Sequence, residues 1–238
     1  MRRLIRADIR RFLAKPSFYV VLAAALALTV LNHPADSAGE QIEMYKSSLG
    51  TLYLFLVSMP VFLGIYGDEI KSGVRISAIG RGIHRKKIVM AKLCDVAIIM
   101  LGCFILAFVL ILVRNSFTDL AITPSQNLML FVYCIFCVIR SVGYFALASL
   151  VVFLSWSSAS GLFVLIVYSL ILNMVLKGIQ TKFTVPVYDI SFDGLMDEAY
   201  AHIQVGQPGI CLIAAVIIYI CLVVYLTNKF FKRKELAL

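Results

Sequence analysis

The sequence predicts an all-α, polytopic membrane protein, and three observations carry this prediction. Hydrophobic residues make up 61% of the 238 residues and charged residues only 15%, which lies outside the range of soluble globular domains. The apolar residues gather in runs of about 20, the length with which a helix crosses a hydrocarbon core roughly 30 Å thick. Within these runs the hydrophobicity is continuous and does not alternate in steps of two, as it would in the strands of an outer-membrane barrel. Six membrane spans are therefore expected, at residues 17–33, 50–67, 90–113, 128–154, 161–176 and 209–228.

The basic residues predict the orientation of these spans. In a six-span chain, both termini and the connection between the second and third spans lie on one side of the membrane, and these segments hold 17 Lys and Arg residues. The connections on the other side hold only four. By the positive-inside rule, both termini are expected in the cytoplasm. The net charge of +9 then reflects orientation and contact with anionic membrane lipids. No nucleic-acid partner is expected, because no soluble domain carries a basic patch.

Residues 1–16 predict an amphipathic helix that lies in the cytoplasmic membrane interface. Arginines fill most of its faces, while four apolar residues share one face at helical spacing: Ile5, Ile9, Phe12 and Leu13. Pro16 then begins the first span, at a position where its missing N–H costs little. We expect this span to be retained rather than cleaved as a signal peptide, because the residues around His33 form a poor cleavage site.

Later signals in the chain set the expected shape of the remaining spans. Pro60 predicts a kink in the second span. Only residues 155–160 separate the fourth span from the fifth, so these two helices are expected to form a tight antiparallel hairpin. The connection 177–208 is expected to be extracellular and to carry a short surface helix near residues 197–203.

No catalytic site and no metal site is predicted. All six cysteines fall in the expected spans, whereas the three histidines fall in connections or, for His33, at the very end of the first span. An intramembrane protease or acyltransferase would need a nucleophile with its base, an acidic pair or a metal set at membrane depth. The chain also has no phosphate-binding loop of the form G-x-x-x-x-G-K-[ST]. An intramembrane enzyme is therefore disfavoured, and ATP is not expected to bind this chain.

The connection between the second and third spans, residues 68–87, combines basic residues with a regular order. Ile70, Val74 and Ile79 can share an apolar side, and Gly82 breaks the helix that precedes it. This pattern predicts a helix–break–helix elbow on the cytoplasmic side. The simpler interpretation is that the basic residues only fix the orientation of the protein, which requires no particular order.

The order of these residues resembles a known family. A carboxylate at the end of the second span is followed by basic and glycine residues at characteristic spacing: Asp68 or Glu69, then Gly73, Arg75, Gly82, Arg85 and Lys92. This pattern is similar to the coupling segment of type-2 ATP-binding-cassette (ABC) export permeases, and most similar to the small six-span subunits of bacteriocin and lantibiotic immunity exporters. The layout of the chain resembles theirs as well. The segment departs from the family pattern in having two adjacent acids, Asp68 and Glu69, and in having His84 where many relatives carry a small hydroxyl residue.

The resemblance implies a function and a set of partners. Residues 1–238 would form a single permease domain in the bacterial cytoplasmic (plasma) membrane. The domain would export a bacteriocin-like peptide or another amphiphile. A separate ABC ATPase subunit would bind ATP and Mg and supply the energy, and a second permease copy or paralogue would complete the pathway. The residues implied at the ATPase contact are Asp68, Glu69, Arg75, Gly82 and Arg85.

Two polar residues inside expected spans are further candidates. Arg140 is the one ionisable residue deep in a span, where an arginine costs about 2.5–3.5 kcal/mol on insertion scales. It would serve either the translocation pathway, the permease–permease interface or a structural pairing with neighbouring helices. Asn173 would line the pathway or join two helices. Nearer the cytoplasmic side, Lys92 and Asp95 are spaced for an ion pair within one helix.

Two other functions remain as alternatives. A secondary transporter would usually show internal repeats or intramembrane acids. The sequence shows no repeat, and the acid within its expected spans, Asp95, lies near the cytoplasmic end of the third span. A non-catalytic membrane adaptor would need only the spans and their orientation.

Overall fold

The computed structural model describes residues 2–31, 37–68, 70, 84–117, 122–183 and 185–233. In this part of the chain all regular secondary structure is helical and there is no strand. The first half contains α1 (Arg2–Leu13), α2 (Pro16–Leu31), α3 (Ala38–Ser48), η1 (Leu49–Tyr53), α4 (Leu54–Phe62), η2 (Leu63–Gly67) and α7 (Arg85–Asn115). The second half contains α8 (Pro124–Ser155), α9 (Ser158–Ile166), η3 (Val167–Leu172), α10 (Asn173–Phe183), α11 (Val187–Ile190), α12 (Phe192–Gln204) and α13 (Ile210–Arg233). The prediction of an all-α protein is confirmed.

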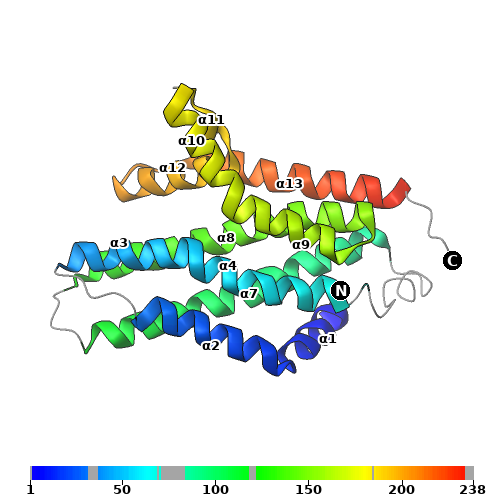
Figure 1. The fold of residues 1–238 in the computed structure, drawn as a ribbon, viewed down its shortest axis with the longest axis horizontal. Helices are drawn as coiled ribbons and strands as arrows, with labels where there is room; N and C mark the ends of the chain where they lie inside the picture. Colours follow the sequence, from blue (N-terminus) through cyan, green and yellow to red (C-terminus); the bar gives the residue numbers. More distant parts are fainter. Residues whose placement is uncertain are drawn as a thin grey trace.

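The long helices lie side by side in one bundle, as Figure 1 shows. Five continuous helices are long and apolar enough to cross a membrane: 38–67, 85–115, 124–155, 158–183 and 210–231. A sixth span is formed only if α1 and α2, which meet at a bend of 71°, are counted as one. The helices α7, α8 and α13 pack against one another in the bundle. This length and composition fit a multi-pass membrane protein with five to six spans.

The N-terminal helix is amphipathic, as predicted, and part of its apolar face meets the protein, although Leu13 is exposed. Phe12 is buried and its ring lies 4.5 Å from the ring of Phe18, measured between centroids. Helix α1 also packs on α7. Since Asp8 of α1 accepts a hydrogen bond from Lys92 of α7, α1 is attached to the bundle by both apolar and charged contacts.

The second span, for which a kink at Pro60 was predicted, departs from regular α-helix on both sides of this residue. Proline has no N–H to donate to the carbonyl one turn earlier and disturbs the hydrogen-bond ladder of a helix. The span accommodates this with two π-helical segments, η1 before α4 and η2 after it. Such wide turns place carbonyls and side chains out of the regular helical register.

The tight connection between α8 and α9 is also confirmed. Trp156 ends α8 with a left-handed backbone conformation (φ 59°), and its N–H bonds to the carbonyl of Val152. Helix α9 begins at Ser158 and packs back against α8. The chain therefore reverses direction within two residues.

The connection expected at residues 177–208 differs from the prediction. Residues 177–183 continue helix α10, which rises away from the bundle in Figure 1. Helix α12 (orange) lies beside the first turns of α13 and packs on both α13 and α8. It covers the surface helix expected near residues 197–203 and is longer, with Glu198 and Ala201 exposed on one face. On its other face Phe192, Met196 and Ala199 recur at helical spacing and are buried against the bundle.

Candidate functional site

The side chain of Arg140 lies halfway along α8 and is only 11% exposed. Its Nε lies 3.1 Å from Oδ1 of Asp193, which is an ion-pair contact. One of its terminal nitrogens donates a hydrogen bond to Oδ1 of Asp197. Both carboxylates come from α12, where they are spaced one turn apart. The arginine therefore holds α12 against the middle of α8.

Three further polar side chains complete this arrangement. The Tyr144 hydroxyl, one turn after Arg140 on α8, donates to Oδ1 of Asp193 at 2.6 Å. Asn173, the first residue of α10, donates through Nδ2 to the Tyr144 oxygen at 3.4 Å. Tyr188 of α11 donates its hydroxyl hydrogen to Oδ2 of Asp197. We call the set the arginine cluster: Arg140, Tyr144, Asn173, Tyr188, Asp193 and Asp197.

The two carboxylates of the cluster differ in their exposure to solvent. The side chain of Asp193 is 2% exposed and that of Asp197 is 42% exposed. Burial raises the pKa of Asp193, while the positive charge of Arg140 and the hydrogen bond from Tyr144 act in the opposite direction. In the described part of the chain, Oδ2 of Asp193 has no hydrogen-bond partner. The ion pair between Arg140 and Asp193 is thus buried, whereas the carboxylate of Asp197 reaches the surface.

Asp197 opens onto a small polar depression of about 300 Å³ between α3, α8 and α12. Glu43 and Lys46 of α3 border the same depression and form an ion pair at 2.6 Å. Tyr200 of α12 also lines it and lies 5.3 Å from Nζ of Lys46, measured to the ring centroid. The arginine cluster is therefore reached from one side of the bundle through polar groups.

A second charged region lies where α1, the start of α7 and the end of α13 gather, which we call the basic end of the bundle. Lys15, which follows α1, forms an ion pair with Asp68 at the end of the second span. Nζ of Lys92 lies 2.7 Å from Oδ2 of Asp8, and the lysine is 1% exposed. Asp8 also pairs with Arg11 at 2.8 Å. These contacts fix α1 to the second and third spans.

Arg85 attaches the start of α7 to the end of α13. Its guanidinium donates a hydrogen bond of 2.6 Å to the carbonyl oxygen of Phe231 and lies 5.4 Å from the centre of the Phe231 ring. A cation that binds a carbonyl in the last turn of a helix also interacts favourably with the negative end of the helix dipole. Arg85 therefore joins the start of α7 to the end of α13 within this chain.

The structure brings some of the predicted residues together and separates others. Arg140 and Asn173 meet through Tyr144 in the arginine cluster. Asp68 and Arg85 both lie at the basic end, where Asp68 pairs with Lys15 and Arg85 bonds to Phe231 of α13. The other predicted contact residues, Glu69, Arg75 and Gly82, lie outside the described residues. Lys92, which we expected to pair with Asp95 of its own helix, donates a hydrogen bond to Asp8 of α1.

The partners of Arg140 were not among the residues predicted from the sequence. Asp193 and Asp197 stand four residues apart, a spacing that places both on one face of a helix. Their segment was read as an extracellular connection, so its acids were not matched to an arginine inside a span. The rule that intramembrane charges seek partners could have joined them, because the chain offers one such arginine.

In the described part of the chain, no group of three or more His, Cys, Asp and Glu side chains is placed to hold a metal ion. The arginine cluster offers charge and hydrogen bonds, which can position a helix or recognise a polar group. No protein-family model matches this chain, and no curated protein matches it in sequence.

Proposed function

We propose that this chain is the membrane-spanning permease subunit of a type-2 ABC exporter. A separate ATPase subunit binds ATP and Mg and supplies the energy. The substrate is a bacteriocin-like peptide or another amphiphile, which leaves the cell or the membrane. The multi-pass helical architecture and the order of residues in the 68–87 segment support this function.

The observation that carries the proposal is that residues near both ends of the 68–87 segment are attached to other parts of the chain. Asp68 is paired with Lys15 next to α1, and Arg85 is bonded to Phe231 of α13. A force applied between these two points would act on the second span, α7, α1 and α13 together. Packed helices respond to such a force as rigid bodies rather than by continuous deformation. An external ATPase that presses on the segment could therefore move several spans at once.

A second permease copy or paralogue also belongs to this proposal. Only 11% of the most apolar stretch of the span 158–183 is buried within the chain, against 50% for the span 124–155. Exposed large side chains on this span include Phe163, Leu170 and Met174. A second subunit would cover part of this face and enclose a pathway between the two copies.

The test is co-purification with an ATPase subunit encoded beside this chain. We expect Arg75→Glu to abolish co-purification and to abolish stimulation of ATP hydrolysis, because it reverses charge within the proposed contact. The matched control is Lys182→Glu, an equal charge reversal on the exposed side of α10. If Arg75→Glu leaves both the complex and its turnover unchanged, the assignment of the coupling segment is wrong.

A proton-coupled secondary transporter is the second candidate. The burial of Asp193 beside Arg140 is the observation that favours it. Buried acids paired with an intramembrane arginine occur in proton relays. The chain would then transport its substrate in proteoliposomes that contain a pH gradient and no ATPase. Asp193→Asn would remove this transport, whereas an ATP-driven exporter would show no transport under these conditions in either form.

A further inference from the structure

A continuous groove runs along α13 where it meets α7 and α8. It consists of two adjoining depressions, of about 700 Å³ and about 450 Å³. Four residues line both of them: Ala97, Val142, Ile220 and Cys221. We call this feature the α13 groove. One residue comes from α7, one from α8 and two from α13, so the groove follows the junction of the three helices.

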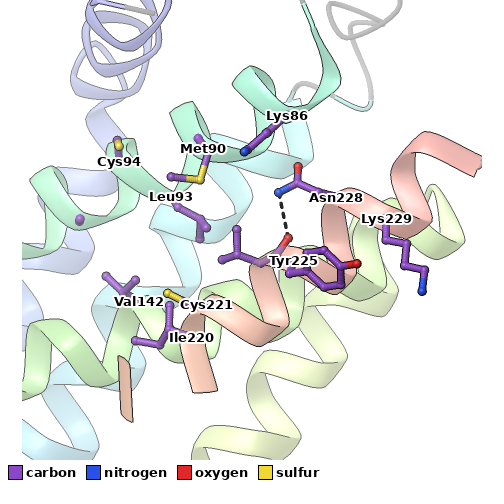
Figure 2. A pocket seen from close by; sticks show the side chains of 12 residues that line it. Lys86, Met90, Leu93, Cys94, Val142, Ile220, Cys221, Tyr225, Asn228 and Lys229 are labelled. Atoms are coloured by element: carbon purple, nitrogen blue, oxygen red, sulfur yellow. Dashed lines mark hydrogen bonds between the residues drawn. The ribbon is translucent and has the colours of Figure 1, made fainter. Parts of the chain in front are cut away.

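Charge is confined to one end of the α13 groove. Figure 2 shows Lys86 and Lys229 at this end, with Tyr225 and Asn228 between them and the apolar side chains Val142 and Ile220 further along. No acidic residue lines either depression in the described part of the chain. The far depression has only apolar and sulfur-containing side chains and reaches Met196 of α12. The groove is therefore cationic at one end and apolar over the rest of its length.

Asn228 adds an unused acceptor at the cationic end. Its Nδ2 donates a hydrogen bond of 2.9 Å to the carbonyl oxygen of Val224 in its own helix. Its Oδ1 is buried and has no hydrogen-bond partner among the described residues. An unpaired buried acceptor costs free energy. A bound hydroxyl group would satisfy it.

The length of the first depression alone matches the hydrocarbon part of one membrane leaflet. Along α13, the first depression extends from Lys229 to Ile220, which is about 14 Å at a rise of about 1.5 Å per residue. One leaflet contributes roughly half of a hydrocarbon core about 30 Å thick. Lysines near the ends of membrane helices extend their ammonium groups toward the headgroups. The two lysines thus lie where a headgroup would be, and the apolar part lies where an acyl chain would be.

We infer that the α13 groove binds an anionic phospholipid. Its phosphate lies at the cationic end that Lys86 and Lys229 line, a hydroxyl of its glycerol headgroup donates to Oδ1 of Asn228, and an acyl chain follows the groove toward Met196. Two cations that share a depression with no acidic residue among those described select an anionic headgroup over a zwitterionic one. The inference does not depend on the transport function, because it concerns only this groove.

Native mass spectrometry of the purified full chain tests this site. The protein is first freed of bound lipid in detergent and is then given phosphatidylglycerol or phosphatidylcholine with identical acyl chains. We expect phosphatidylglycerol to be retained about thirtyfold better, as two interfacial lysines imply. The double variant Lys86→Gln/Lys229→Gln should reduce its retention to the level of phosphatidylcholine. The control Lys87→Gln/Arg10→Gln removes two exposed charges from the same end of the bundle and should leave retention unchanged.

A second pair of variants tests the apolar part of the groove. Cys221→Trp fills the groove and should release the bound lipid, whereas Leu222→Trp, at an exposed neighbouring position outside the groove, should not. Equal retention of the two lipids would overturn the inference, as would unchanged retention in both the double lysine variant and Cys221→Trp. It would also be overturned if Cys221→Trp abolished a concentration-dependent dimer without affecting lipid, because a second copy would then occupy the groove. Binding of free glycerol phosphate as tightly as the lipid would exclude the acyl-chain contact.

Discussion

Arg140 illustrates how one charged residue can be accommodated within an apolar bundle. Its charge is balanced by Asp193, which is almost completely buried, and by Asp197, which is partly exposed. Replacing a buried ion pair by apolar residues can be neutral, but removing one partner leaves an uncompensated charge. The two carboxylates are not equivalent in this respect, because only Asp193 depends on Arg140 for the compensation of its buried charge.

This asymmetry gives a prediction at the level of single side chains. Arg140→Leu should lower the free energy of unfolding by about 3–5 kcal/mol, because it leaves Asp193 buried without its cation. Asp193→Asn should cost much less, since Arg140 still pairs with Asp197. Thermal unfolding in detergent, followed by size-exclusion chromatography, measures both. The double variant Arg140→Leu/Asp193→Leu should recover most of the loss; a double variant as unstable as Arg140→Leu alone would contradict this account.

The same pair predicts how the Arg140→Leu variant responds to pH. Burial raises the pKa of Asp193 and Arg140 lowers it, so removing the arginine raises the pKa further. A carboxyl group with a raised pKa binds its proton more tightly in the folded state than in the unfolded state. The cost of burying the ionised carboxylate is therefore fully present above the pKa that Asp193 has in the folded state. This cost disappears as the pH falls toward the pKa that the group has in the unfolded state. The stability of Arg140→Leu relative to wild type should improve in acid, whereas that of Arg140→Leu/Asp193→Leu should not show this improvement.

At the level of elements, α12 is positioned by shape as well as by charge. The ring of Phe192 rests directly on the backbone of α8 at Gly143, and a Cβ atom at that position would overlap it. Tyr144, which follows Gly143 on α8, donates its hydroxyl hydrogen to Asp193, which follows Phe192 on α12. The glycine is therefore required for the close approach that brings the carboxylates of α12 to Arg140.

Gly143→Val should consequently displace α12 from α8. Limited proteolysis measures this, since the exposed residues 205–207 that follow α12 should be cut faster when the helix loses its support. Gly102→Val on α7 is the matched control, because nothing lies within 4 Å of a Cβ atom there. Combining Gly143→Val with Phe192→Ala should restore resistance to the protease. Equal cleavage of the Gly143→Val and Gly102→Val variants would argue against this contact.

The elements differ in how far the sequence could predict them. The long spans follow from apolar runs, and the α8–α9 hairpin follows from the short distance between two of them, because both are local properties. The docking of α12 depends on Phe192 meeting Gly143 and on two acids meeting Arg140, about 50 residues away in the chain. Periodicity could indicate that this segment is helical, but it carries no information about which surface the helix would contact. The pairing of Arg85 with a backbone carbonyl of α13 leaves no sequence pattern at all.

For the whole molecule, the distribution of charge makes a prediction about orientation. The basic end, with α1 and the ends of α7 and α13, should face the cytoplasm, and the loop after α12 should face outward. In a background without the six native cysteines, Val205→Cys should react with a membrane-impermeant maleimide in intact cells. Lys87→Cys should react only after the membrane is permeabilised. The reverse pattern would invert the orientation and would place the proposed ATPase contact on the wrong side.

The chain contains a single tryptophan, and its position gives the protein a built-in fluorescent reporter. Trp156 lies at the α8–α9 turn with its ring 6.1 Å from that of Phe231, the residue whose carbonyl Arg85 holds. Any ligand or subunit that shifts the start of α7 against α13 should therefore change the intensity or wavelength of the indole emission. Motion at this end of the molecule can thus be followed by light, in the native sequence and without an attached dye.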